Sequence, residues 1–323
     1  MNRLERVAAK VYKTAMKKIV VFVLAFLICF AVSSCFLRKV VSGSTRISGA
    51  TYADAKKYSV GNFSYRSSDV ETISVDYISG TLKIVQSESK TLEATETSSS
   101  KLSDAQTVHW FIDGKTLRIK FCESGFNGTI PNKTLVLEIP SGMDLEIGVT
   151  SGEVSFDTDV YAETVSIGAT SGDVHVKNLT AEKVEFGSTS GDTYIDGLFA
   201  DQVKMGSTSG NTEIGTLVAG EMDFASTSGA TRINAAVCDS IDGGGTSGNI
   251  YIGLDGCSKL KIGCTSGNVE LSRLPAGGAT VEYEKTSGVL KADGYTVKGG
   301  KMVFGNGGCQ ISVTTTSGNL TIK

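Results

Sequence analysis

The stretch "GSTSGDTYIDG", residues 187–197, returns with small changes as "GSTSGNTEIGT" at residues 206–216, nineteen residues later. Its centre, Thr-Ser-Gly, occurs nine times, and most of the intervals between copies are nineteen residues. The copies begin at Thr150, Thr170, Thr189, Thr208, Thr227, Thr246, Thr265, Thr286 and Thr316. A fixed period near twenty residues indicates a solenoid of stacked repeats, here called rungs, rather than a globular domain.

The apolar positions within each repeat predict strands. Apolar residues stand five and three positions before the threonine, as Val184 and Phe186 do. Others stand four and six positions after it, as Val174 and Val176 do. Each pair has the alternation of a strand with one buried face. The prediction is an all-β fold, a single-chain parallel β-solenoid whose rung is strand, turn, strand and return loop.

An earlier segment, "ISVDYISGTLKIV" at residues 73–85, follows the same pattern, so the solenoid is predicted to start near residue 70. Residues 107–121 predict a hairpin around Asp113 and Gly114. A second hairpin, turning at Gly299 and Gly300, is predicted in the insertion 293–310, where it would cover the exposed final rung.

The glycine of each Thr-Ser-Gly is predicted to make the sharp turn, because glycine adopts backbone conformations that other residues resist. An Asp or Asn often follows it and is predicted to bond its own turn. The turn glycines are Gly152, Gly172, Gly191, Gly210, Gly229, Gly248, Gly267, Gly288 and Gly318.

Small residues form another column, eleven positions after the threonine, and are predicted to be buried. They are Ala181, Ala200, Ala219, Cys238, Cys257 and Ala276. The two cysteines are interpreted as small apolar residues, and the alternative is a disulfide between stacked neighbours. The cysteines outside the N-terminal apolar run have no paired metal-ligand spacing and the two histidines are far apart, so no metal and no cofactor is expected.

The N-terminal region predicts export of the rest of the chain. Residues 1–18 are a short basic segment, and the uncharged apolar run Ile19–Leu37 is long enough to cross a bilayer. The positive-inside rule then places residues 1–18 in the cytoplasm, residues 38–69 as a spacer outside, and the solenoid, residues 70–323, beyond it.

Two other readings of this region remain open. If translation starts at Met16, the run is a secretory leader. "VSSC", residues 32–35, resembles a bacterial lipoprotein processing box that would be lipidated at Cys35. All of these readings export the body, which is mildly acidic and therefore a poor partner for nucleic acid.

Three features recur in one known family: the segment "LVLEIPSGMDLEIGVTSGEVSF" (135–156), the "TSGD" and "TSGN" turns, and the segment "GNGGCQISVTTTSGNLTIK" (305–323). Together they resemble the bacterial putative-adhesin family, extracytoplasmic β-strand-repeat proteins classed as a domain of unknown function. The resemblance covers residues 70–323 and implies a β-solenoid at the cell surface that serves in adhesion or envelope-stress signalling. The family has no shared catalytic motif to transfer.

The function expected is that of a membrane-anchored, non-catalytic binding or scaffold protein, with a cell-wall polymer, surface glycan or membrane protein as partner. The turn serines are interpreted as turn residues, with a contact surface for a glycan or partner as the alternative; they are Ser171, Ser190, Ser209, Ser228, Ser247 and Ser266. The other candidate for a contact surface is the outward-facing column, His175, Tyr194, Glu213, Arg232, Tyr251 and Glu270, although a mixed exposed surface is usual for any solenoid.

Two alternatives differ in class. One is an envelope-stress sensor or regulatory module that acts through membrane partners. The other is a polysaccharide-active enzyme of the β-helix type, with Asp173 and Asp192 stacked as paired carboxylates.

Overall fold

The computed structural model describes residues 40–41, 44–292, 295–297 and 300–323. The all-β prediction is confirmed, since the only helices in this part of the chain are single 3-10 turns: η2 (Ala55–Lys57), η3 (Ser67–Asp69) and η4 (Asp104–Gln106). Within these residues no helix is long and apolar enough to cross a membrane. The predicted span Ile19–Leu37 and the predicted lipidation site Cys35 lie outside the described residues.

The chain divides into an N-terminal unit that ends at Glu182 and a C-terminal unit that begins at Lys183. The strands of the first are β1 (Val40–Val41), β2 (Ser44–Ser48), β3 (Ser59–Val60), β4 (Phe63–Arg66), β5 (Thr72–Tyr77), β6 (Thr81–Gln86), β7 (Thr91–Ser98), β8 (His109–Asp113), β9 (Thr116–Lys120), β10 (Asn127–Pro131), β11 (Lys133–Ile139), β12 (Met143–Val149) and β13 (Glu153–Ala169). Strand β14 (Val174–Ser188) spans the boundary.

In the N-terminal unit, β5 and β6 form the predicted early rung, with a turn at residues 78–80. Strand β12 pairs in parallel with β5, and β13 pairs in parallel with β6. Strand β11 lies on the other side of β6 and also pairs antiparallel with β7. Strands β8 and β9 form the hairpin predicted around Asp113 and Gly114.

The predicted spacer carries structure over its described part. Strand β2 pairs with β10, β3 with β8, and β4 with β7, all antiparallel. Its short strands escape detection in the sequence because each is only two to five residues long.

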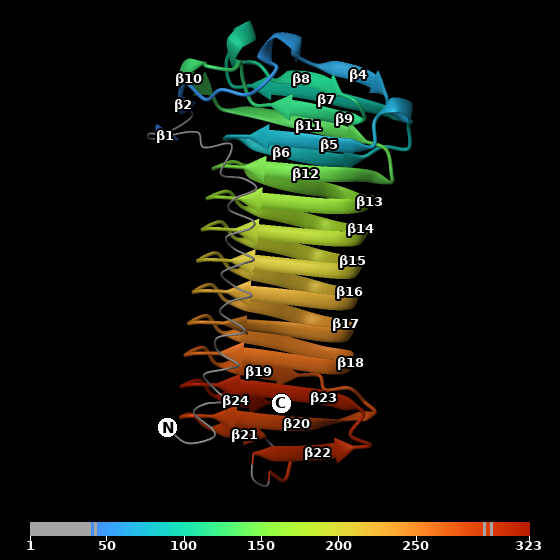
Figure 1. Ribbon diagram of the computed structural model, residues 1–323, viewed down its shortest axis with the longest axis vertical. Helices are drawn as coiled ribbons and strands as arrows, with labels where there is room; N and C mark the ends of the chain where they lie inside the picture. The colour runs from blue at the N-terminus through green and yellow to red at the C-terminus, as the bar shows by residue number, and fades with distance from the viewer. Residues whose placement is uncertain (1–39, 42–43, 293–294, 298–299) are drawn as a thin grey trace. The chain divides into compact units, whose positions relative to one another are not determined.

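The C-terminal unit begins with long parallel strands, which Figure 1 shows stacked one above the next. Its strands are β15 (Thr193–Ser207), β16 (Thr212–Ser226), β17 (Thr231–Gly245), β18 (Ile250–Cys264), β19 (Val269–Ser272), β20 (Gly278–Lys285), β21 (Leu290–Ala292), β22 (Lys301–Gly305), β23 (Cys309–Thr315) and β24 (Leu320–Ile322). The paired residues of β15 and β16 run from Thr193 opposite Thr212 to Ser207 opposite Ser226. The segment predicted as a return loop is therefore part of the ladder.

The last strands are threaded out of sequence order, as Figure 1 shows. Strand β23 pairs in parallel with β18 on one side and with β20 on the other. Strand β24 lies in the same way between β19 and β21. The end of the chain thus returns to fill a rung between two earlier ones.

Strand β22 pairs antiparallel with β20. The hairpin predicted in the insertion 293–310 turns at Gly299 and Gly300, and Gly299 lies outside the described residues. The described strand of the insertion, β22, lies on the side of β20 that β23 leaves open, and it therefore covers an outer rung.

The core of the C-terminal unit consists of apolar columns, one residue per rung. The two clearest are Ile195, Ile214, Ile233, Ile252 and Leu271, and Val203, Met222, Ile241, Leu260 and Ile311, each at most 2% exposed. The column of small residues is less uniform than predicted. Cys238 is buried, Cys257 is partly exposed, and Ala276 is exposed because the chain leaves the ladder after Ser272.

Candidate functional site

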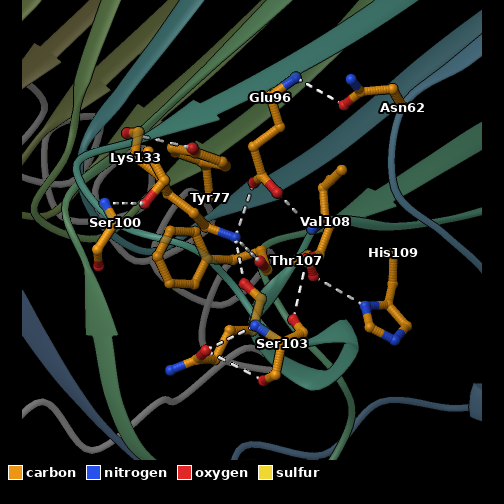
Figure 2. Close-up of polar contacts among 12 residues, drawn as sticks. Asn62, Tyr77, Glu96, Ser100, Ser103, Thr107, Val108, His109 and Lys133 are labelled. Carbon is orange, nitrogen blue, oxygen red and sulfur yellow. Dashed lines mark hydrogen bonds and ion pairs between the residues drawn. The ribbon is translucent and has the colours of Figure 1, made fainter.

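A charged pair lies in the interior of the N-terminal unit, between β7 and β11. Lys133 Nζ and Glu96 Oε1 are 2.8 Å apart, and the two side chains are 0% and 2% exposed. The strands are antiparallel, with Leu135 opposite Glu96, so the pair is diagonal across neighbouring strands. Figure 2 shows the two head groups pointing toward one another.

Backbone groups surround both charges. Lys133 Nζ donates to the carbonyl oxygens of Gln106, at 2.7 Å, and Phe121, and it lies 4.1 Å from the centre of the Phe121 ring. Glu96 Oε2 accepts the Val108 N–H at 2.9 Å. Three oxygen atoms therefore surround an ammonium that has three protons to donate. The cluster ties the segment around η4 to β7 and β11.

Burial dominates the electrostatics of this cluster. It lowers the pKa of Lys133, and the charge of Glu96 opposes that shift without cancelling it. Burial also raises the pKa of Tyr77, whose hydroxyl lies 3.4 Å from the Lys133 carbonyl oxygen. Because both charges are enclosed and compensated, the pair presents neither an acid nor a base to solvent.

A surface depression of about 570 Å³ opens beside the pair. It is lined by Gly61, Asn62, Glu96, Ser98, Ser100, Lys101, Leu102 and Thr107. Two of its polar groups serve the fold itself, since Asn62 Oδ1 accepts the Glu96 N–H and Thr107 Oγ1 donates to Ser103. The depression can offer hydrogen bonds to a polar ligand, but its carboxylate is turned inward to Lys133.

The sequence interpretation missed this pair, although a signal for it exists. Glu96 follows Leu92 and Ala94 on the inward phase of β7, and Lys133 precedes Leu135 on the inward phase of β11. A charge on the buried phase of a strand is rarely tolerated without a partner. Two such charges of opposite sign would have predicted an ion pair.

The turn glycines stack directly on one another. In the C-terminal unit a Cβ built at Gly210, Gly229, Gly248 or Gly267 would lie 1.9 Å from the carbonyl oxygen of the preceding turn glycine. Among the turn glycines of the rungs, only Gly80 and Gly288 have a positive φ, of 85° and 119°. The predicted reason, backbone conformation, therefore holds at those two, and close approach accounts for glycine at the four positions Gly210, Gly229, Gly248 and Gly267.

The polar residue after the glycine bonds the next rung rather than its own turn. Asn249 Oδ1 accepts the Asn268 N–H at 3.0 Å, and Asn268 Oδ1 accepts the Asn319 N–H at 3.1 Å. Asp192 takes part in the same ladder, since its Oδ1 accepts the Asn211 N–H at 2.7 Å. The proposed catalytic carboxylate Asp192 thus has a structural role in holding adjacent rungs in register.

The remaining predicted surface residues lie on the outside. Ser171, Ser190, Ser209, Ser228, Ser247 and Ser266 are all exposed at the turn tips. Tyr194, Glu213, Arg232, Tyr251 and Glu270 form one row, in register from β15 to β19. His175 is exposed in the N-terminal unit. Among the described residues no group of three or more His, Cys, Asp or Glu side chains is arranged to hold a metal ion.

Solved structures share this fold. One titled a putative adhesin from Parabacteroides distasonis is 14% identical, with a TM-score of 0.54 over 82% of this chain and 97% of that one. Another putative adhesin, from Parabacteroides merdae, is 14% identical, with a TM-score of 0.53 over 83% and 96% of the two chains. No curated protein matches the chain. The family model described as Toastrack DUF4097 matches residues 70–323, and the chain belongs to that family.

Proposed function

We propose that the protein is a non-catalytic binding protein held outside a bacterial membrane, and that its ligand is a surface or cell-wall glycan. The two similar structures named putative adhesins support this proposal at the level of the fold. The basic and apolar N-terminal segment supports the membrane anchor, with lipidation of Cys35 as its alternative.

The row Tyr194, Glu213, Arg232, Tyr251 and Glu270 is the observation that carries the proposal. Adjacent parallel strands place these side chains about 4.8 Å apart along one line. The row combines two tyrosine rings with charges of both signs, and the Arg232 guanidinium lies 4.1 Å from the centre of the Tyr251 ring. Tyrosine and arginine are enriched among residues that dominate binding energy.

A regular row suits a polymer better than a compact ligand, because the row and a polymer each repeat along one direction. Polar groups in the turn column are used to join rung to rung, as the Asp192 and Asn268 contacts show. The row also makes side-chain contacts between rungs, since Asn234 donates to Glu213 Oε1 and Lys323 pairs with Glu270, but these contacts join side chains only, whereas the turn column also bonds backbone N–H groups. The binding surface is therefore assigned to the row.

The test uses the full chain in detergent micelles, offered to purified cell-wall polymer and to an array of surface glycans. The double variant Tyr194→Ala, Tyr251→Ala is expected to bind at least tenfold more weakly, the loss of about 1.4 kcal/mol or more that truncating such residues causes. The matched control is Phe199→Ala, which removes an aromatic ring that is 36% exposed elsewhere on β15.

Equal binding by the double variant and the wild type would contradict the assignment to this row. Capture of membrane proteins with no binding to any glycan would contradict the ligand class and favour a sensor or regulatory module.

A further inference from the structure

Strand β22, residues Lys301–Gly305, has an open edge. It pairs antiparallel with β20, and among the described strands β20 is its only partner. Figure 1 shows no strand beyond β22 on the side away from β20. An open edge presents backbone N–H and C=O groups that a strand from another chain can pair with. The partner that this edge suits can be inferred from its geometry and its side chains.

Hydrogen bonds at the two ends of the β20–β22 pair show which residues of β22 face β20. The Tyr283 N–H donates to the Gly300 carbonyl oxygen at 2.8 Å, and the Asn306 N–H donates to the Gly277 carbonyl oxygen at 3.0 Å. In an antiparallel pair such bonded positions alternate with positions whose backbone groups point away from the partner. The even-numbered residues of β22 therefore face β20, and its odd-numbered residues face the open edge.

Val303 is the central residue of the open edge. Its side chain is 58% exposed, the highest value among the large apolar side chains of the described residues. By the alternation just described, its N–H and C=O point away from β20, and so do the C=O of Lys301 and the N–H of Gly305. The edge thus combines an exposed apolar side chain with outward backbone groups, a combination that folded proteins usually protect from other chains.

The open edge is complementary to itself. Two copies of β22 that run antiparallel about a two-fold axis at Val303 place Val303 opposite Val303 and Lys301 opposite Gly305. This register pairs all of the outward groups just named, in about four hydrogen bonds. A shift by one residue would set outward groups against inward ones, and a shift by two would leave Val303 opposite Lys301 or Gly305.

The side chains favour the same register. Two valines meet at its centre, and opposed β-branched side chains stabilise a pair of strands. The Lys301 ammonium bonds Glu282 Oε1 at 2.8 Å, so its charge is compensated within its own chain. Because Lys301 lies opposite glycine, no like charges face each other across the pair. A second copy of β22 therefore suits the edge in hydrogen bonding, in apolar contact and in charge.

We propose that β22 is an interaction edge and that its partner is β22 of a second copy of this chain, paired antiparallel with Val303 opposite Val303. The contact is isologous, since the same residues are used on both sides of a two-fold axis. Each copy contributes one short strand, so the contact belongs to the small, transient class and forms where copies are crowded.

The first experiment is disulfide cross-linking of the full chain in detergent micelles. In the proposed register the two Val303 Cα atoms are about 5.5 Å apart, a separation that a disulfide spans. On mild oxidation Val303→Cys is expected to give about tenfold or more cross-linked dimer than the wild type, whose yield reports the background from the native cysteines.

Lys301→Cys is the matched control, because it lies on the same edge and its side chain is also exposed. In the proposed register the two copies of residue 301 are about 13 Å apart along the strands, too far for a disulfide. This variant should therefore give no more dimer than the wild type. Equal yields from the two cysteine variants, or no dimer from Val303→Cys, would overturn the proposal.

The second experiment asks whether the strand edge itself makes the contact, by sedimentation of the full chain at rising concentration. Proline has no N–H, and it is tolerated on an edge strand where that N–H points away from the sheet. Val303→Pro is therefore expected to stay monomeric at concentrations where the wild type forms a dimer. Val303→Thr is the matched control and should still form the dimer, because threonine keeps the N–H and the β-branched shape.

Hydrogen exchange in β20 checks that β22 stays in place in both variants. A dimer that persists in Val303→Pro, equal loss in Val303→Thr, or a wild type that is monomeric at every concentration would reject pairing through this edge. Neither the cross-linking nor the sedimentation involves glycan binding, so both are independent of the proposed function.

Discussion

Glycine is required in most of the turns because successive rungs approach each other there more closely than any side chain allows. At Gly229 an added Cβ would lie 1.9 Å from the Gly210 carbonyl oxygen and 2.6 Å from its carbon. These are backbone atoms that neighbouring ladder hydrogen bonds hold in place, as Thr227 N–H to Ser207 O and Ser228 N–H to Thr208 O illustrate. A methyl group can be accommodated only if the rungs separate locally.

Gly229→Ala is therefore expected to lower the free energy of unfolding by about 1–3 kcal/mol or more, as overpacking does in a close-packed interior. The measurement is urea unfolding of the two proteins under the same conditions. Gly263→Ala is the matched control, because a Cβ at Gly263 meets nothing within 4 Å. If the two substitutions lower the free energy of unfolding by the same amount, close approach of the rungs is not the reason for glycine in the turn.

At the scale of elements, the N-terminal unit uses a buried ion pair where the C-terminal unit uses repeated apolar columns. The pair Lys133–Glu96 joins β7 to β11, and Lys133 also donates to the carbonyl oxygens of Gln106, the last residue of η4, and of Phe121, which follows β9. Exposed pairs such as Lys115–Glu71, with side chains 70% and 64% exposed, contribute little because water solvates both partners. Removal of one buried partner leaves a charge that water cannot reach.

Glu96→Gln is accordingly expected to destabilise the protein by about 3–5 kcal/mol, and the double variant Glu96→Gln, Lys133→Met to recover most of that loss. The loss in Glu96→Gln should shrink as the pH rises toward the ordinary pKa of lysine. Burial lowers the pKa of Lys133 in the folded state, so the unfolded chain binds more protons and stability rises with pH.

Chemical denaturation between pH 6 and 10 measures both effects, with Lys115→Met as the exposed control. A loss in Glu96→Gln no larger than in that control would show that Lys133 does not depend on Glu96.

At the scale of the whole molecule, the order of rungs in space differs from their order in the chain. The turn at Thr316 stacks on that at Thr265, through Thr316 N–H to Cys264 O and Ser317 N–H to Thr265 O. The turn at Thr286 then stacks on the turn at Thr316, through Ser287 N–H to Thr316 O. The final residues of the chain are thus an internal layer of the C-terminal unit.

Deletion of residues 306–323 should therefore open a gap inside this unit rather than fray one end. Strands β20 and β21 would lose the edges of β23 and β24 that they pair with, and β22, whose partner is β20, would lose the support of that strand. Strands β15, β16 and β17 would keep every partner within the unit. Hydrogen exchange followed by mass spectrometry should show full loss of protection in β20 and β22 and retained protection in β16. Deletion of Lys323 alone serves as the control, and protection retained in β20 after the long deletion would contradict the threading.

Several features could be predicted from residues close together in the sequence. Val184 with Phe186, repeated every nineteen residues, was sufficient to predict strands, since alternation and period are local properties of the chain. The early rung at residues 73–85 and the hairpin at Asp113–Gly114 were predicted in the same way and are confirmed. Within the candidate site, the outward row was predicted from the alternation of inward and outward positions along each strand. The Lys133–Glu96 pair was not predicted.

The sequence by itself thus determined the fold class, the repeat and the places where each rung turns, because each depends on residues within about twenty positions of one another. The tertiary structure decided which rung lies beside which, why glycine occupies the turns, and which charges meet. Glu96 and Lys133 are separated by tens of residues, and their contact depends on how the strands of the N-terminal unit pair. The order in which the rungs stack is set by backbone hydrogen bonds between their strands. Any rung with the same alternation of apolar and polar residues can make those hydrogen bonds, so the local sequence pattern does not determine which rung lies beside which.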